Sequence, residues 1–352
     1  MPTKTTIMAE PIRVVQFGLG PIGLASAAVL LDKQATGHVH LVGAIDIDPN
    51  KAGRDLGDLL GGTEPTGIVV SADAAQTLAQ TRPDVVAHTT SSFLDRMSDQ
   101  LVLCAEAGAH VVSSTEELAF PYDRHPAISA TLDEAAKANG VVILGTGVNP
   151  GYAMDTLALT ATGACIDVTS VRVERIVDAG KRREPLQRKV GAGIHVDEFE
   201  ARKQSGTFGH IGLRESLLLV AEGLGWTLDR IEETLDPVIV TETVVTPYLE
   251  AKVGDAAGIH HKIVGYRGDD PLLSLDLKMY VGAHNPQDAV YVEGTPPINL
   301  VVQGGIFGDT ATVAALVNAI PLVMQAPAGL RTVKDLPIPR AFATSRSVPE
   351  TA

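Results

Sequence analysis

Short apolar runs alternate with longer amphipathic stretches along the first 150 residues or so. The apolar runs are rich in valine and hold few polar positions, as is typical of strands covered on both faces. Strands are expected at 12–18 (IRVVQFG), 38–46 (HVHLVGAID), 67–71 (GIVVS), 84–90 (DVVAHTT), 110–114 (HVVSS) and 140–147 (GVVILGTG), and helices at 22–34, 94–108 and 125–140. This alternation predicts a Rossmann-type, doubly wound α/β domain with a parallel sheet over residues 1–150.

The pattern changes after residue 150, where apolar and polar positions begin to alternate one by one. Such strands have one buried and one wet face, which favours a mixed or antiparallel sheet. The expected strands are 169–179, 236–246, 256–267, 271–282 and 289–294, with a helix at 213–226. We therefore predict a second, α+β domain over 151–305. By analogy with other two-domain folds, this domain is expected to bind the substrate and to pair with a second copy as a homodimer. A last helix, 308–327 with Asp309 as its N-cap, belongs to a C-terminal segment 306–352.

Charge and composition exclude several kinds of partner. The formal net charge is -14, so nucleic acid and anionic membranes are not expected to bind. No apolar run reaches the roughly 20 residues of a membrane helix. The N-terminal residues lack the apolar core of a secretory signal, so a cytoplasmic location is expected. Cys104 and Cys165 lack metal-ligand spacing and are interpreted as reduced core residues, so no metal site is predicted.

The turn after the first expected strand reads FGLGPIG and carries the G-x-G-x-x-G pattern at Gly18, Gly20 and Gly23. In a chain with 34 glycines a lone match is weak evidence, but here a strand precedes it and a helix follows. Gly18 allows a tight turn, Gly20 lets a pyrophosphate approach, and Gly23 lets the helix pack on the strand. With Pro21 and Ile22, the loop is the predicted phosphate site of a dinucleotide. The alternative is a glycine turn that serves only the fold.

Asp46 ends the second expected strand, 23 positions after Gly23. An acid near this position binds the adenosine ribose in dinucleotide-binding domains. Because a 2′-phosphate would meet a carboxylate, Asp46 favours NAD(H) over NADP(H). Lys51 and Arg54 lie just beyond and could turn toward a 2′-phosphate, so NADP(H) stays open as a second cofactor. The alternative is that Asp46 only shapes the turn.

Two adjacent carboxylates, Glu116 and Glu117, follow the strand that ends in HVVSS. Ligands of parallel sheets bind at the carboxyl ends of the strands, so this position favours a catalytic group over the cofactor. The alternative is an acidic helix start, with Ser114 or Thr115 as its cap and the helix dipole favouring acids in the first turn.

Other polar residues at strand ends are candidates for cofactor binding. The hydroxyls of Thr90, Ser91 and Ser92 could reach the cofactor riboses, or only cap their strand. The amide of Asn149 could bond the nicotinamide carboxamide, or only shape the turn before Pro150. Five cations between Lys181 and Lys189 could bind a substrate anion, although a solvated loop is the commoner role of such a cluster.

Several long strings closely resemble the 2,4-diaminopentanoate dehydrogenases and the related native amine dehydrogenases. They are TEELAFP (115–121), GTGVNPGYAMD (145–155), VDAGKRREPLQRKVGAG (177–193), FGDTATVAALVNAIP (307–321) and PAGLRTVKDLP (327–337). The resemblance runs from about residue 12 to about residue 340. It implies that the helix from Asp309 returns to the nucleotide domain, and that the chain forms a homodimer.

The resemblance also implies a reaction, the NAD(P)-dependent conversion of an amine or diamine to a ketone and ammonia, or its reverse. It further implies that a glutamate of TEELAFP is the catalytic group. A carboxylate suits an amine, because it can take a proton from the ammonium and then stabilise the iminium cation. We favour Glu116 slightly over Glu117.

Two other readings stay open at this point. One is an imine or C=C reductase of the dihydrodipicolinate reductase type, although its basic motif is not found here in matching form. The other is a non-catalytic nucleotide sensor, which would need no acidic pair.

Overall fold

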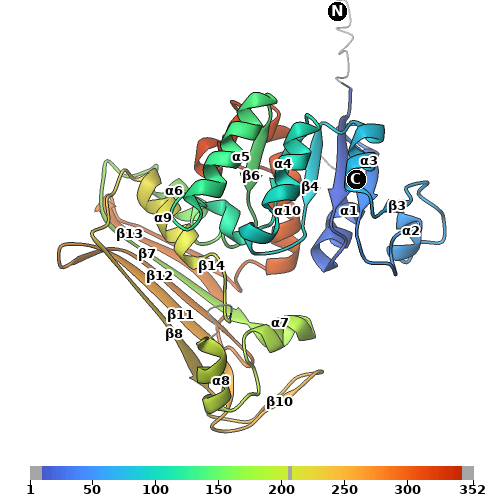
Figure 1. The fold of residues 1–352 in the computed structure, drawn as a ribbon. Helices are drawn as coiled ribbons and strands as arrows, with labels where there is room; N and C mark the ends of the chain where they lie inside the picture. The colour runs from blue at the N-terminus through green and yellow to red at the C-terminus, as the bar shows by residue number, and fades with distance from the viewer. Residues whose placement is uncertain (1–9, 205–207, 343–352) are drawn as a thin grey trace, which may run out of the picture. The chain divides into compact units, whose positions relative to one another are not determined.

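The computed structural model describes residues 10–204 and 208–342. They divide into two compact units, one built from the residues up to Gly147 and from Asp309 onward, the other from Val148–Gly308 (Figure 1). Residues 343–352, the end of the expected C-terminal segment, lie outside the described residues.

The first unit contains a seven-stranded parallel sheet with the order β15-β6-β5-β4-β1-β2-β3. Its strands are β1 (Ile12–Phe17), β2 (Val39–Ile45), β3 (Val70–Ser71), β4 (Val85–His88), β5 (His110–Ser113), β6 (Val142–Gly145) and β15 (Gly329–Arg331). The order runs outward from β1 in both directions, as in a doubly wound Rossmann-type sheet. The prediction of this fold class is confirmed.

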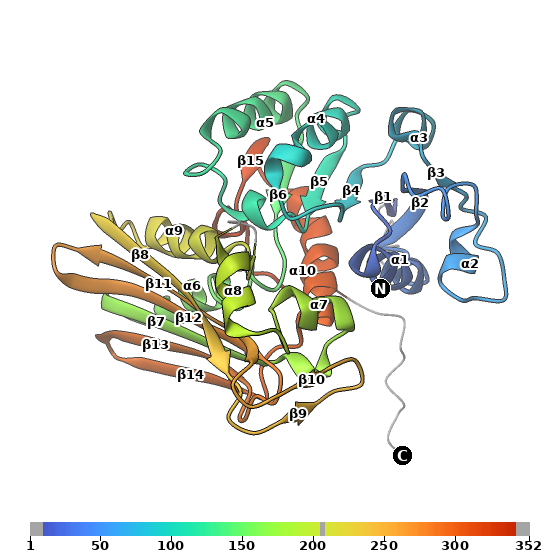
Figure 2. The ribbon, with the colours of Figure 1, turned by 60° about the horizontal axis from the view of Figure 1, so that its bottom comes forward.

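Helices cover both faces of this sheet (Figure 2). One face packs against α1 (Pro21–Gln34) and α10 (Gly308–Val323), through apolar residues such as Leu30 and Leu316. The other packs against α3 (Ala74–Thr81), α4 (Ser98–Glu106) and α5 (Pro126–Ala138). The unit also contains the short helix α2 (Leu56–Leu59) and the 3-10 helices η1 (Leu94–Arg96), η2 (Glu116–Ala119) and η4 (Val333–Asp335). Because both faces are covered, the strands are mostly apolar.

The second unit contains a six-stranded mixed sheet with the order β14-β13-β7-β12-β11-β8. Its strands are β7 (Asp167–Asp178), β8 (Arg230–Ile239), β11 (Ala256–Arg267), β12 (Asp270–Tyr280), β13 (Gln287–Thr295) and β14 (Ile298–Gln303), and a separate hairpin pairs β9 (Val244–Val245) with β10 (Glu250–Ala251). Only β7 and β12 pair in parallel; the other neighbours are antiparallel. The predicted mixed sheet is confirmed.

One face of the mixed sheet is apolar and the other is polar. The apolar face forms a core with α6 (Thr156–Thr162) and α9 (Leu213–Gly223), where residues such as Leu217, Ile263 and Leu275 are fully buried. Intervening positions are charged: His260 bonds Asp276 at 3.0 Å on neighbouring strands. The remaining elements are η3 (Ala179–Lys181), α7 (Glu184–Lys189) and α8 (Val196–Lys203).

Two local predictions are wrong. Asp309 is not the N-cap of α10, because the helix already includes Gly308; Asp309 lies in its first turn. Residues 236–246 do not form one strand, because β8 ends at Ile239. There the backbone of Val240 turns away to bond Gly254 and Asp255. Strand β14 and helices α7 and α8 were not among the expected elements.

The two cysteines differ in their surroundings. Cys104 lies in the core between α4 and the sheet, and burial raises the pKa of its thiol to about 12. Cys165 is only partly buried, and its Sγ donates to the Pro296 carbonyl at 3.1 Å. The core prediction therefore holds for Cys104 and not fully for Cys165. In the part of the chain that the structure describes, no helix has the length and apolar content to cross a bilayer, and no three acids, histidines or cysteines cluster as metal ligands would.

Candidate active site

The glycine loop joins β1 to α1 in a geometry that only small residues allow. Gly18 has a φ of 89°, and a Cβ there would lie 2.7 Å from the Thr89 carbonyl oxygen. A Cβ on Gly23 would lie 1.9 Å from the Gly18 oxygen. At Gly20, the N-cap of α1, a Cβ would meet nothing within 4 Å, so the space in front of the helix N-terminus is open. The loop therefore has the form of an anion site, with Pro21 opening the helix.

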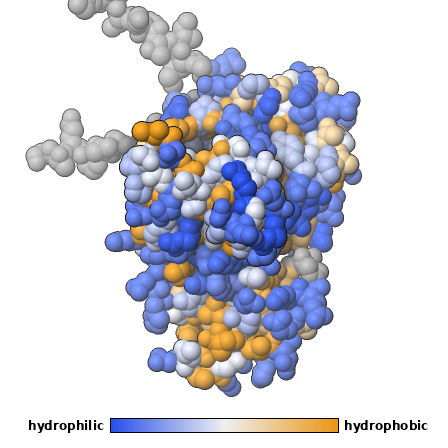
Figure 3. Space-filling model, turned by 90° about the vertical axis from the view of Figure 1, so that its left-hand side faces the viewer, coloured by the Kyte–Doolittle hydropathy of each residue, from blue (hydrophilic) through white to orange (hydrophobic). Residues whose placement is uncertain are grey.

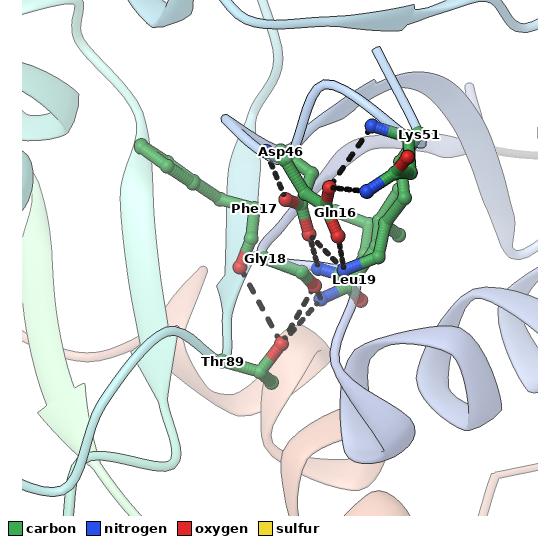
Figure 4. A network of polar contacts seen from close by, with 9 residues as sticks. Gln16, Phe17, Gly18, Leu19, Asp46, Lys51 and Thr89 are labelled. Carbon is green, nitrogen blue, oxygen red and sulfur yellow. Dashed lines mark hydrogen bonds and ion pairs between the residues drawn. The ribbon is translucent and has the colours of Figure 1, made fainter. Parts of the chain in front are cut away.

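The Asp46 carboxylate is bonded both to the glycine loop and to its own turn (Figure 4). Its Oδ2 accepts the Leu19 amide at 2.7 Å and faces the Lys51 ammonium at 3.1 Å. Its Oδ1 accepts the Asp48 amide at 2.8 Å. The carboxylate thus fixes the glycine loop from the end of β2, and Lys51 offsets part of its negative charge.

A second support of the loop, Gln16 with Thr89, was missed by the sequence reasoning. The Gln16 amide nitrogen donates to the Gly18 oxygen at 3.1 Å and to the Thr89 hydroxyl at 2.9 Å (Figure 4). Gln16 is fully buried, between Val15 and Phe17 in β1. The signal for this support in the sequence was a glutamine in an apolar run beside a glycine turn, because a buried amide needs hydrogen-bond partners.

The two glutamates after β5 have different surroundings. The Glu117 carboxylate is buried, accepts the Leu94 amide at 2.8 Å and lies 2.9 Å from His125 Nε2. Arg124 approaches its other oxygen at 3.8 Å. Glu117 thus holds η1 against η2. Glu116 opens η2 with a partly exposed side chain, at the carboxyl end of β5. The hydroxyl of the cap residue Thr115 makes no capping bond to the helix, while both glutamates lie in its first turn, as an acidic helix start would place them.

The hydroxyls after β4 are engaged within the protein. The Thr90 hydroxyl lies 3.0 Å from His88 Nε2 and donates to Gln100 Oε1 at 3.1 Å. Ser91 Oγ accepts the Phe93 amide at 3.3 Å, and the Ser92 carbonyl accepts the Glu117 amide at 3.3 Å. These groups line the strand ends and tie the β4 loop to η2.

Asn149 belongs to the second unit. Its Nδ2 donates to Met154 Sδ at 3.3 Å and lies 3.1 Å from His210 Nε2. Burial, followed by the charges of His261 and nearby cations, lowers the pKa of His210 well below 6.5, so His210 is neutral and can accept. Asn149 Oδ1 is buried without a hydrogen-bond partner among the described residues. It therefore offers an acceptor for an N–H group.

The turn that carries Asn149 is fixed by a buried acid. Asp155 accepts the Gly151 amide and the Ser216 hydroxyl, each at 2.7 Å. Burial raises the pKa of this carboxyl, against the lowering effect of these bonds. Asp155 thus anchors the turn to α9.

The predicted loop of cations is helical. Lys181 ends η3 and faces Asp178 at 3.6 Å, while Arg188 pairs with Glu184 within α7 at 2.6 Å. Arg182 is buried. An i,i+4 pair stabilises α7, so the segment forms short helices rather than a loop. Lys181, Arg188 and Lys189 are exposed, as in a solvated cluster.

The fold and the glycine loop define the class of protein: a Rossmann-type α/β protein with a separate mixed-sheet unit. The family model of the 2,4-diaminopentanoate dehydrogenase C-terminal domain matches residues 152–349. The 2,4-diaminopentanoate dehydrogenase of Acetoanaerobium sticklandii is 33% identical over 343 residues, covering 95% of each chain. The chain belongs to the 2,4-diaminopentanoate dehydrogenase family.

Two amine dehydrogenases are also similar to this chain. That of Streptomyces virginiae is 25% identical over 362 residues, covering 93% of this chain and 96% of its own. The solved amine dehydrogenase of Mycobacterium smegmatis superposes with a TM-score of 0.83 at 29% identity, covering 95% of this chain and 98% of its own. The predicted resemblance is confirmed, and the chain is an oxidoreductase of the amine dehydrogenase kind.

Proposed function

We propose that this enzyme catalyses the reversible, NAD-dependent oxidative deamination of an amine or diamine. An ammonium substrate, NAD⁺ and water give a ketone, an ammonium ion, NADH and one proton. The names of the relatives support an amine substrate, and the carboxylate pair after β5 supports the chemistry. NAD(H) is the proposed cofactor, with NADP(H) as a second one, and the natural amine is left open.

The first unit has the features that a dinucleotide needs. The open space in front of Gly20 and the helix N-terminus of α1 suit a pyrophosphate. Asp46 lies at the end of β2, where the ribose hydroxyls of the adenosine half bind in such sheets. Thr90, Ser91 and Ser92 remain candidates for contacts with the cofactor. When bound, the nicotinamide ring accepts the hydride from the carbon that bears nitrogen.

Glu116 is the proposed catalytic residue, and one observation carries this proposal. Glu117 is buried and holds the Leu94 amide and His125, whereas Glu116 combines a strand-end position with a partly exposed side chain. Glu116 takes a proton from the substrate ammonium, since only the free amine can push the hydride out. Its negative charge then stabilises the iminium cation until water attacks it.

The mixed-sheet unit is proposed to hold the substrate and to form a homodimer in the cytoplasm. Asn149 Oδ1 remains the proposed acceptor for the nicotinamide carboxamide. Figure 3 shows one face of the molecule, on which hydrophobic residues gather in the lower part of the view. Exposed large apolar side chains of the second unit are Ile166, Ile239, Val245, Tyr248, Val253, Val301 and Phe307. Covering them against a second copy would remove apolar surface from water.

The test compares Glu116→Gln with Glu117→Gln. A panel of amines is oxidised with NAD⁺ or NADP⁺, and the matching ketones are reduced with and without ammonia. Glu116→Gln should lower kcat by roughly 10²-fold or more, while NADH binding survives. Glu117→Gln is the matched control: it should lower stability by about 1–3 kcal/mol and spare most of kcat. If wild type turns over ketones without ammonia, or if Glu116→Gln keeps near-full activity, the proposal fails.

A further inference from the structure

His88 ends β4 and is completely buried in the first unit. Its Nδ1 lies 2.9 Å from Ser113 Oγ on the neighbouring strand β5, and its Nε2 lies 2.9 Å from Gln100 Oε1 on α4. The ring also packs edge-on against Phe17 at the end of β1, with ring centres 5.3 Å apart. One side chain thus contacts the carboxyl ends of β1 and β5 and the helix beside them.

The chemistry of its partners fixes the tautomer of His88. Burial lowers the pKa of this imidazole to about 4, so it carries a single N–H at neutral pH. Gln100 presents a carbonyl oxygen, which can only accept, so the proton belongs on Nε2. Nδ1 is then an acceptor for the Ser113 hydroxyl.

The Nδ1 side supports the carboxylate segment. Ser113 Oγ is hydrogen-bonded to the Thr115 hydroxyl at 3.0 Å and accepts the Thr115 amide at 3.2 Å. Thr115 directly precedes Glu116 at the start of η2. A change at Nδ1 therefore moves the backbone from which Glu116 projects.

The Nε2 side supports the glycine loop. Thr90 is held through its hydroxyl, 3.0 Å from His88 Nε2 and 3.1 Å from Gln100 Oε1. Its methyl group packs so closely on the glycine turn that a Cβ on Gly18 would lie only 2.8 Å from it. A change at Nε2 is therefore expected to loosen Thr90, against which the glycine loop packs.

We propose that His88 is a positioning residue that sets two parts of the active site independently, the catalytic carboxylate through Nδ1 and the cofactor loop through Nε2. This inference rests on the proposed roles of Glu116 and the glycine loop. His88 itself touches neither substrate nor cofactor. Because its two nitrogens serve different loops, their effects on catalysis and on cofactor binding can be separated by substitution.

Asparagine and glutamine substitutions separate the two nitrogens, since the amide of asparagine reaches the place of Nδ1 and that of glutamine the place of Nε2. His88→Gln keeps the bond to Gln100 and loses Ser113, so kcat should fall roughly 10-fold with the Kd of NADH nearly unchanged. His88→Asn keeps Ser113 and loses Gln100, so the Kd of NADH should rise roughly 10-fold with a smaller change in kcat. NADH binding is measured by fluorescence and kcat by amine oxidation at saturating cofactor.

Three further variants guard against a purely structural effect. Ser113→Ala and Gln100→Ala remove the same bonds from outside the ring, so they should reproduce the kcat and Kd effects respectively. His110 is the matched control: it is a partly buried histidine at the opposite end of β5, and its Nδ1 accepts the Val142 amide at 3.0 Å. His110→Gln should lower stability and leave kcat and Kd unchanged.

The outcomes separate this inference from the proposed function. If both His88 variants lower kcat and weaken NADH binding in equal proportion, or if neither does, independent positioning is refuted. If wild type does not oxidise amines, the proposed function fails. NADH binding by His88→Asn and His88→Gln then still tests whether His88 Nε2 supports the cofactor loop. Equal affinities of these two variants would then refute the inference.

Discussion

Acidification should destabilise the protein through His88. In the unfolded chain a histidine titrates near 6.5, whereas in the folded unit the pKa of His88 is about 4. Between these values the unfolded state binds more protons, so stability is present above about pH 6.5 and is lost as pH falls toward 4. The full difference between the two pKa values corresponds to about 3 kcal/mol in the free energy of unfolding. Lowering the pH from 7.5 to 5.5 should remove roughly 1 kcal/mol of this stability.

Two measurements test this directly. Urea unfolding of wild type and His88→Gln at both pH values should show a pH-dependent loss that is roughly 1 kcal/mol larger in wild type. His110 and His210 also have lowered pKa values, but they are present in both proteins and cancel in the comparison. The imidazole resonance of His88 in labelled protein should not titrate above about pH 5. A resonance that titrates near 6.5, or equal pH slopes of the two proteins, would refute the buried neutral histidine.

Two further predictions concern the cofactor and the assembly. Asp46→Ala removes the acceptor of the Leu19 amide and releases Lys51. The ratio of kcat/KM with NAD⁺ to kcat/KM with NADP⁺ should therefore fall roughly 10-fold, with Asp48→Ala as the control. An unchanged ratio would leave Asp46 only a structural role. Light scattering at micromolar concentration should give the mass of a homodimer, and a monomer mass would contradict the proposed pairing of the second units.

The local pattern of the sequence was sufficient for the main elements of the first unit. Valine-rich runs separated by helical stretches predict its parallel sheet, because a strand covered on both faces must be apolar at nearly every position. The predicted strand 256–267 coincides with β11, since its burial alternates as its residues do. Where a strand ends is a different matter. Valine is a residue type common in strands, but the Val240 backbone is hydrogen-bonded to Gly254 and Asp255. The end of β8 is therefore set by a turn further along the chain.

The sequence by itself determined the fold class, the glycine loop and the family, because these follow from patterns among residues that are near one another in the chain or from long shared strings. It also placed both glutamates at a strand end. Only the tertiary structure distinguishes their surroundings, because the partners of Glu117, Leu94 and His125, come from other segments. The same holds for His88, whose partners Gln100 and Ser113 are 12 and 25 positions away. Hydrogen bonds between distant segments depend on how the strands and helices pack, and no local pattern records them.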